Sequence, residues 1–271
     1  MLPSKKIAWC TDIHLDWEED KLSFLGSLDA INPDYVFLTG DIAEGHSIEG
    51  FLTKISDLRA NIYFILGNHD YFGSSFTKVR AAMVELCDKY ENLHWLPNSG
   101  VVELTKGVGL VGVDGWYDAR CGATSPIKFI MNDWRLIEEL KPYEHRHIEL
   151  VDKIREIADK EVKLAKLYLR EAASNYNNVF FLTHVPPWRE AAWYGTGFSE
   201  NAAAPWFCSV AMGEMIEDIA QEFPLTNFEV FAGHTHSHGV FYPASNVKCT
   251  TGMAVYGKPI INEIIALRER F

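Results

Sequence analysis

The sequence lacks several features that mark specialised classes of protein. Its five cysteines are odd in number, lie far apart and form no Cys-x-x-Cys pair. This argues against a disulfide framework and against a thiolate zinc site. No apolar run is long enough for a membrane span, and the first residues do not read as a secretory signal. We therefore expect a reduced, cytoplasmic protein that does not interact with a membrane.

Positive charge is also scarce. The 271 residues hold 25 Lys and Arg against 37 Asp and Glu, a formal net charge of -12. Bulk binding of nucleic acid is not expected, because it depends on a positive field. A nucleotide or another small phosphoester is still compatible with this balance as a substrate, since bound metal cations can reverse the field locally.

Low-complexity stretches, internal repeats and Pro/Gly/Ser-rich linkers are absent from the sequence as well. Its hydrophobic content of 48% is enough to bury a full core. We therefore predict one domain over residues 1–271.

Short apolar runs alternate with segments of helical spacing along much of the chain. The predicted strands are Ile7–Cys10, Tyr35–Thr39, Ile62–Leu66, Leu110–Val113, Val179–Thr183 and Phe228–Ala232. The predicted helices between them are Lys21–Ala30, Ile48–Arg59 and Ser74–Tyr90. This alternation predicts an α/β layered fold with some parallel pairing. From Gly239 onward, Val240–Pro243, Val247–Thr251 and Ile260–Leu267 suggest an antiparallel β segment.

The segment from about 116 to 178 interrupts the alternation. Within it, apolar residues recur every three or four positions from Ile148 to Leu169, with charged residues between them. This spacing predicts a long amphipathic helix. The helix either packs on the outside of the sheet or belongs to a cap over the site.

Polar side chains follow the ends of five predicted strands. They are Asp12 and His14, then Asp41, then Asn68, His69 and Asp70, then His184, and finally His234 and His236. An α/β fold builds its sites at such strand ends, so these residues are expected at one rim. Residues two apart in an extended chain point the same way, which suggests that each Asp-x-His or His-x-His pair addresses one metal. Oxygen and nitrogen ligands without thiolates suit manganese, iron, zinc or cobalt.

The ordered motifs Asp-x-His, Gly-Asp, Gly-Asn-His-Asp, His and Gly-His-x-His resemble the signature of the calcineurin-like metallophosphoesterase superfamily. They span Asp12 to His236, which is most of the chain. The resemblance implies a four-layer α/β/β/α sandwich of mixed sheets flanked by helices, with a helical insertion. The second motif lacks the arginine of the protein phosphatases, and Glu44 stands where purple acid phosphatases have tyrosine. This favours the bacterial-type branch of phosphodiesterases, nucleotidases and small-molecule phosphatases.

The resemblance also implies a role for each matched residue. One metal would be bound by Asp12, His14 and His236, the other by Asn68, His184 and His234, and Asp41 would bridge both. Two such ions can share a hydroxide and clamp the phosphate oxygens during in-line displacement. His69 would stabilise the phosphoryl oxygens or protonate the leaving group, and Asp70 would orient the His69 ring.

Residues near the rim suggest how a substrate could be held. Trp116 and Trp188 offer rings for stacking, and Arg120 or Arg189 could contact the phosphate or the leaving group. In the alternative, the tryptophans pack the loops and the arginines pair with surface carboxylates. A second alternative concerns the whole chain, which could be a catalytically silent binding protein on the same fold. Because Asn68 and His69 are both present, we favour an enzyme.

Overall fold

The computed structural model describes residues 5–15, 21–122, 130–195, 197–198 and 203–267. Its strands are β1 (Lys5–Cys10), β2 (Tyr35–Thr39), β3 (Asn61–Ile65), β4 (Leu93–Trp95), β5 (Val102–Thr105), β6 (Val108–Gly112), β7 (Asn178–Leu182), β8 (Trp193–Tyr194), β9 (Gly197–Phe198), β10 (Asn227–Ala232), β11 (Gly239–Ala244), β12 (Val247–Thr251) and β13 (Glu263–Leu267). Its α-helices are α1 (Lys21–Ile31), α2 (Ile48–Ile55), α3 (Phe76–Lys89), α4 (Leu96–Ser99), α5 (Asp133–Leu136), α6 (His147–Asn175) and α7 (Val210–Glu222). Short 3-10 turns cover His69–Tyr71, Lys141–Tyr143, Arg189–Ala191 and Ala204–Trp206.

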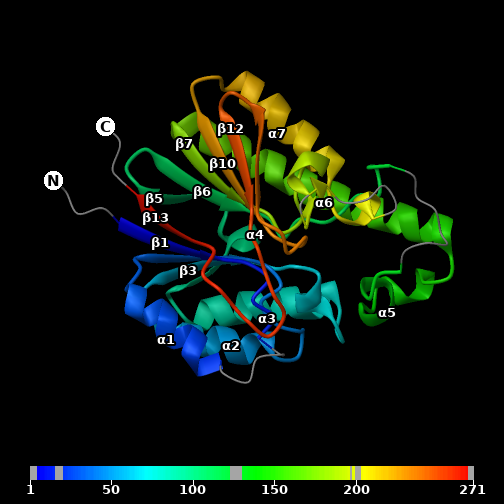
Figure 1. Cartoon of the computed structure of the whole chain (residues 1–271), viewed down its shortest axis with the longest axis horizontal. Coiled ribbons are helices and arrows are strands. Elements are labelled where there is room, and N and C mark those ends of the chain that lie inside the picture. The colour runs from blue at the N-terminus through cyan, green and yellow to red at the C-terminus, as the bar shows by residue number, and fades with distance from the viewer. Residues whose placement is uncertain (1–4, 16–20, 123–129, 196, 199–202, 268–271) are drawn as a thin grey trace.

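Two mixed sheets lie face to face at the centre of the molecule (Figure 1). One has the strand order β13-β1-β2-β3-β4 and the other β11-β12-β10-β7-β6-β5. Strands β1 to β4 run parallel, as do β6, β7, β10 and β12, whereas β13, β11 and β5 pair antiparallel at the edges. The parallel strands bring several loops to one end of each sheet.

Side-chain alternation along the strands builds the core between the sheets. In β1, Ile7 and Trp9 point toward the second sheet, while Ala8 and Cys10 face the helices on the other side. The Trp9 ring packs edge-on against Phe231 of β10, with 4.9 Å between ring centroids. Strands buried on both faces explain why the sequence shows continuous apolar runs instead of alternation.

Helices cover the outer face of each sheet. Helices α1, α2 and α3 cover one sheet, and α6 and α7 cover the other. Each helix presents an apolar stripe, such as Ala165, Leu169 and Ala172 on α6. This arrangement confirms the predicted four-layer α/β/β/α sandwich.

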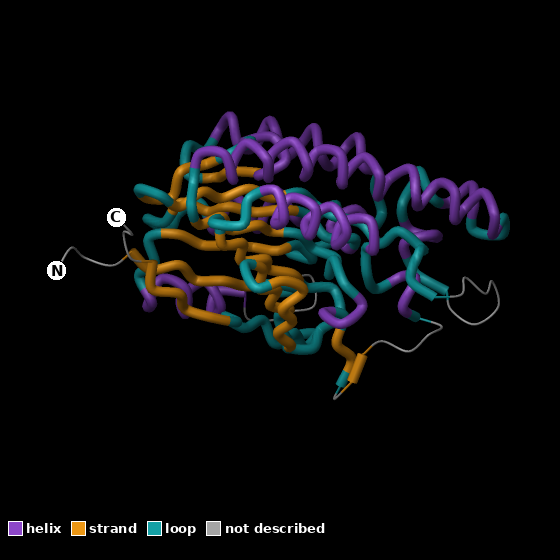
Figure 2. Tube along the Cα trace, turned by 90° about the horizontal axis from the view of Figure 1, so that it is seen from above, coloured by secondary structure: helices purple, strands orange, loops and turns teal. Residues whose placement is uncertain are grey.

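Helix α6 is the long amphipathic helix predicted within the 116–178 segment. Its C-terminal half packs on the sheet, whereas its N-terminal half continues past the strand ends, as Figure 2 shows. There Ile154 and Ala158 share a core with Trp116 and Trp134. The single-domain assignment and a cap function for this segment stay predictions.

All six buried strands and the first three helices lie where the sequence predicted them, but other elements differ. Helix α2 ends at Ile55, because a turn begins at Ser56 in place of the expected continuation to Arg59. Strands β4 and β5 and helix α7 were not predicted. The antiparallel C-terminal segment was wrong in part. Strand β12 pairs parallel with β10, and β13 crosses to the other sheet, because both satisfy their backbone groups against long-range partners. Among the described residues, no helix combines the length and apolarity needed to cross a membrane.

A buried ion network joins α3 to α6. The Arg80 guanidinium lies 3.1 Å from Asp114 Oδ2 and 2.7 Å from Glu161 Oε1. Both carboxylates are almost fully buried, and the Tyr71 hydroxyl also donates to Asp114. Arg80 is thus the cation that balances two buried negative charges.

Arg80→Ala is expected to lower the free energy of unfolding, since it leaves these carboxylates buried without their partner. Breaking a fully buried pair costs roughly 3–5 kcal/mol. The Arg80 side chain is 34% exposed, so we expect about 2–4 kcal/mol, measured by urea denaturation. Lys78→Ala is the control, because its pair with Glu138 is exposed and should contribute less than about 1 kcal/mol. Equal effects of the two substitutions would contradict this view of the network.

Candidate metal centre

Backbone hydrogen bonds draw the loops that follow the strands into one cluster. The amide of Asp12 donates to Gly40 O at 3.0 Å, and the amide of His14 donates to Asp41 O at 3.0 Å. In the second sheet, Gly233 N donates to His184 O at 2.8 Å. These contacts fix the positions of the polar side chains before any ligand is considered.

The local conformation at these loops differs from the expected extended chain. Of the seven described non-glycine residues with positive φ, five are predicted metal ligands: Asp12, His14, Asp41, His234 and His236. Left-handed backbone is uncommon for such residues and costs on the order of 1–3 kcal/mol each. The expectation that the ligand pairs lie in extended chain, with both side chains pointing the same way, was therefore wrong. A left-handed turn at each of these five ligands aims its side chain instead.

Glycines allow the ligand loops to approach one another closely. A Cβ on Gly67 would lie 2.2 Å from Asp41 Oδ1, and one on Gly233 would lie 2.2 Å from Asp12 Oδ2. Both distances are far below van der Waals contact. Only glycine fits at these two positions without a shift of the neighbouring ligand.

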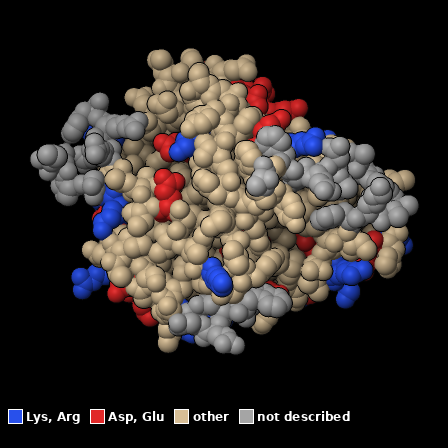
Figure 3. Space-filling view, viewed as in Figure 1, with Lys and Arg blue, Asp and Glu red and all other residues tan. Residues whose placement is uncertain are grey.

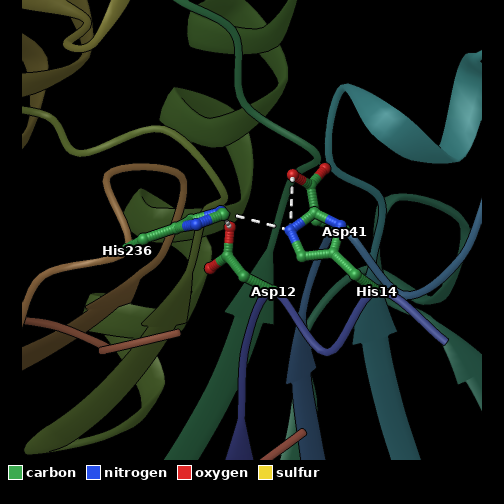
Figure 4. Close-up of side chains that lie close together, drawn as sticks. All are labelled: Asp12, His14, Asp41 and His236. Carbon is green, nitrogen blue, oxygen red and sulfur yellow. Dashed lines mark hydrogen bonds and ion pairs between the residues drawn. The ribbon is translucent and has the colours of Figure 1, made fainter. Parts of the chain in front are cut away.

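The first group of ligands consists of Asp12, His14, Asp41 and His236, drawn in Figure 4. One ligand atom from each lies within 4.8 Å of the others. His14 Nε2 is 3.1 Å from His236 Nε2 and 3.8 Å from Asp41 Oδ2. His236 Nε2 lies 3.3 Å from Asp12 Oδ1. Two carboxylates and two imidazoles thus converge on one point.

A second group meets the first at Asp41. Asn68 Oδ1 lies 3.1 Å from His184 Nε2 and 3.0 Å from His234 Nδ1. His184 Nε2 is in turn 3.3 Å from Asp41 Oδ1. The two oxygens of Asp41 therefore face different groups, as expected for a bridging carboxylate.

The outward-facing nitrogens of two rings are already engaged. His184 Nδ1 lies 2.8 Å from Thr39 O, and His234 Nε2 lies 2.9 Å from Trp206 O. Because a carbonyl oxygen only accepts, each of these nitrogens carries a proton. In neutral His234 the lone pair of Nδ1 then faces the Asn68 oxygen, so two acceptors meet with no hydrogen between them. This donor set fits a divalent cation.

The electrostatics of the centre favour the binding of a cation. Burial lowers the pKa of His14 and of His234 to about 4, so both rings are neutral and offer lone pairs. Burial raises the pKa of Asp12, but His236 outweighs it and brings this pKa to about 2. Burial also lowers the pKa of His184, yet the Asp41 carboxylate outweighs that effect and raises it to about 10. Ionised carboxylates therefore draw cations to this point.

His69 lies at the edge of the cluster and Asp70 lies beneath it. His69 Nε2 is 3.8 Å from Asp41 Oδ2, and its ring packs against Phe72 with 4.3 Å between centroids. The fully buried Asp70 accepts from the amides of Ile42, Ala43 and Gly67. The prediction that Asp70 orients the His69 ring is therefore corrected. Asp70 holds two ligand loops together through their backbone.

The residues first suggested for substrate contacts lie elsewhere. Arg120 pairs with Asp118 and with Asp159 of α6, which is the alternative that the sequence left open. Arg189 begins a 3-10 turn and does not line the cavity in the described part of the chain. Trp116 and Trp188 are buried in the cores. The two tryptophans thus pack the cores, and the charge of Arg120 is satisfied by acidic side chains.

A cavity of about 300 Å³ opens over the ligands. Four predicted ligands (Asp41, Asn68, His234 and His236) and His69 line it. The rest of its wall consists of Phe72, Ile130, Met131, Asn132, Asp133, Tyr194, Phe207, Thr235 and Tyr256. Within the described residues this wall holds neither lysine nor arginine. On the face seen in Figure 3, Lys and Arg stand as separate spots and form no continuous basic surface among the described residues.

Two wall residues were missed by the sequence reading. The Tyr256 ring lies 4.5 Å from His14 and 4.9 Å from His236 between centroids. The buried Asp133 contacts Asn68, and burial raises the pKa of its carboxyl to about 6. Neither belongs to a motif. Tyr256 comes from the loop after β12 and Asp133 from the 116–178 segment, and only the fold brings them to the site.

Comparison with known proteins identifies the family. A model described as calcineurin-like phosphoesterase matches residues 5–238. The chain belongs to the calcineurin-like phosphoesterase family. Membership, together with the buried Asp/His cluster, supports divalent metal binding and phosphoester hydrolysis as the general chemistry.

Individual matches agree with this fold. A phosphopantetheinyl hydrolase from Mycobacterium tuberculosis aligns with a TM-score of 0.70 at 14% identity, over 95% of this chain and 92% of that one. A dimetal phosphatase from Danio rerio aligns with a TM-score of 0.60 at 12% identity, over 95% and 90%. An uncharacterized protein of Acanthamoeba polyphaga mimivirus is 26% identical over 148 residues, which is 49% of this chain. The match spans about half of that relative, 52% of its length.

Gly67→Ala is expected to weaken metal binding, because its Cβ would collide with Asp41 Oδ1 and displace the Asp41 carboxylate. Disturbing the support of a ligand lowers metal affinity about 10- to 100-fold, measurable by calorimetric titration with Mn²⁺. Gly50→Ala is the matched control. Gly50 lies in α2 with open space around it, so alanine there should add roughly 0.5–1 kcal/mol of stability and leave metal binding unchanged. Unchanged affinity in the Gly67 variant would refute the packing argument.

Proposed function

We propose that this chain is a binuclear metallophosphoesterase that hydrolyses a small phosphoester, either a monoester or a diester. One observation carries the proposal: two groups of ligands, each drawn from loops of both sheets, meet at the carboxylate of Asp41. In the proposed assignment, Asp12, His14 and His236 hold one divalent ion and Asn68, His184 and His234 hold the other. Manganese, iron, zinc and cobalt all suit these donors. Such ions act as Lewis acids on phosphoryl oxygens and lower the pKa of water.

The proposed role of His69 follows from its place at the edge of the ligands. Its ring is partly exposed toward the cavity and packs against the rings of Phe72 and His14. Nε2 is therefore available to donate a proton to a leaving oxygen or a hydrogen bond to a phosphoryl oxygen. This keeps His69 outside the ligand sets while placing it beside them.

The cavity wall suggests the character of the substrate. Phe72, Tyr194, Phe207 and Tyr256 supply rings, and Ile130 and Met131 supply apolar surface. The volume of about 300 Å³ is at the small end for ligand pockets. We infer a small phosphoester with an apolar or aromatic leaving group, stacked on these rings in place of the tryptophans first considered.

The alternative of a silent binding protein has less support. All seven ligand positions and His69 are filled by residues that can perform the chemistry. Placement in the bacterial-type branch and a cytoplasmic location stay predictions. The alternative would gain support if metal-loaded protein left aryl phosphomonoesters, aryl phosphodiesters and nucleotides unchanged.

His69→Ala is expected to lower kcat while metal content stays near that of the wild type, because His69 acts beside the ligands. A group that transfers a proton contributes roughly 100- to 10,000-fold to the rate. The measurement pairs elemental analysis with turnover of an aryl phosphoester. His46→Ala, which alters an exposed histidine that does not line the cavity, should change neither. Loss of metal with normal turnover per bound ion would make His69 a ligand instead.

Tyr256→Ala is expected to raise KM for an aryl phosphoester and to change kcat little, since stacking acts equally on the ground and transition states. Ring contacts of this kind contribute about 0.5–1.5 kcal/mol, or roughly 2- to 10-fold in KM. Tyr242→Ala on β11 provides an exposed control away from the cavity. An unchanged KM in the Tyr256 variant would exclude this ring from substrate binding.

A further inference from the structure

Asn68 has a side-chain amide whose two ends face opposite environments. Its oxygen Oδ1 lies 3.1 Å from His184 Nε2 and 3.0 Å from His234 Nδ1, toward the proposed metals. Its nitrogen Nδ2 donates to Asp133 Oδ2 at 3.3 Å. The amide thus connects the ligand cluster to a buried carboxylate that belongs to neither ligand set.

The opposite orientation of this amide is unfavourable because of Asp133. Rotation by 180° would place the Asn68 oxygen against the Asp133 carboxylate, so that two acceptors would meet in a buried site. It would also turn the N–H₂ group toward the metals, where it cannot act as a ligand. A carboxylate accepts only, so it selects the one orientation in which oxygen faces the cations.

Asp133 is itself held in place from several sides. The Tyr117 hydroxyl lies 3.2 Å from Asp133 Oδ1, and the Trp134 indole N–H donates to the same hydroxyl at 3.3 Å. The turn that carries Asp133 is fastened to the loop after Asn68, because Gly73 N donates to Leu136 O at 3.0 Å. Asp133 is 1% exposed, so water does not compete for its oxygens.

From these contacts we infer that Asp133 is a positioning residue, which fixes the Asn68 amide with its oxygen toward the metals and strengthens that oxygen as a ligand. The inference rests on the proposed ligand role of Asn68. A charged acceptor draws the Nδ2 hydrogens and shifts electron density toward Oδ1. Through Asn68, this contact also gives the 116–178 segment a part in metal binding.

The first test uses Asp133→Asn, which keeps the size of the side chain and removes its selection of one orientation of the Asn68 amide. The new amide can donate as well as accept, so both orientations of Asn68 become acceptable. We expect the wild type to bind two Co²⁺ ions per chain, and the variant to bind one of them about 10- to 100-fold more weakly. Calorimetry of the metal-depleted full chain measures the affinities, and the visible spectrum of Co²⁺ reports the altered site.

Asp118→Asn is the matched control. Asp118 is an equally buried carboxylate of the same segment, but it accepts from Ala211 N and Arg120 and contacts no proposed ligand. It should leave both Co²⁺ affinities unchanged even where it lowers the melting temperature. If Asp133→Asn lowers only the melting temperature and binds both ions as the wild type does, the inference is overturned.

A double-mutant cycle separates orientation from general damage. Asn68→Asp alone sets two carboxylates against each other, whereas Asn68→Asp combined with Asp133→Asn restores one donor facing one acceptor. We expect the double variant to bind Co²⁺ more tightly than the sum of the single effects predicts. Strict additivity would contradict an orienting contact.

A metal-free readout keeps this inference apart from the proposed function. In metal-depleted, ¹⁵N-labelled protein, the side-chain amide protons of Asn68 should exchange slowly with water, and faster in Asp133→Asn. Equal exchange in both proteins would overturn the inference, whatever the metal content. A wild type that bound fewer than two Co²⁺ ions, with this exchange difference present, would count against the binuclear function alone.

Discussion

The rest of the site depends on the contacts of the Asp41 carboxylate. Its Oδ1 lies 3.3 Å from His184 Nε2, and its Oδ2 lies 3.8 Å from His14 Nε2, so each oxygen faces a different set of side chains. Oδ1 also accepts the backbone N–H of His69 at 2.9 Å. Because the two sets arise from both sheets, this one side chain ties the sheets together where their strands end. Burial makes an uncompensated charge here costly, and cations are the natural compensation.

Holding that carboxylate in place accounts for much of the surrounding structure. Five of the seven predicted ligands adopt left-handed backbone, and Gly40 and Gly67 come so close to their neighbours that no side chain would fit. Such strain persists only where the surrounding structure enforces it. Asp70 supplies part of that enforcement through three backbone amides, and the packed layers behind the loops supply the rest. The fold is therefore a rigid frame for a site that is locally strained.

The sequence was informative where chemistry and periodicity coincide. Continuous apolar runs such as Tyr35–Thr39 predicted the buried strands, and the motifs at their ends predicted which loops meet. It was uninformative where one residue depends on a distant partner. The pairing of β13 with β1, the contact of Asp133 with Asn68 and the ring of Tyr256 over His14 all join segments far apart in the chain. No local pattern encodes these contacts. Similarly, Arg120 was a reasonable phosphate ligand by type, but Asp118 and Asp159 satisfy its charge.

The cavity at the centre combines predicted metal ligands with aromatic side chains. Its described wall holds the rings of Phe72, Phe207 and Tyr256 and neither lysine nor arginine. In the proposed function, bound metals and His69 act on the phosphoester, and these rings face its leaving group. The most direct test of this account is anomalous diffraction from a crystal soaked in Mn²⁺. The account predicts two peaks about 3.5–4 Å apart, one on each side of the Asp41 carboxylate. A single peak, or a pair of peaks that do not share Asp41, would contradict it.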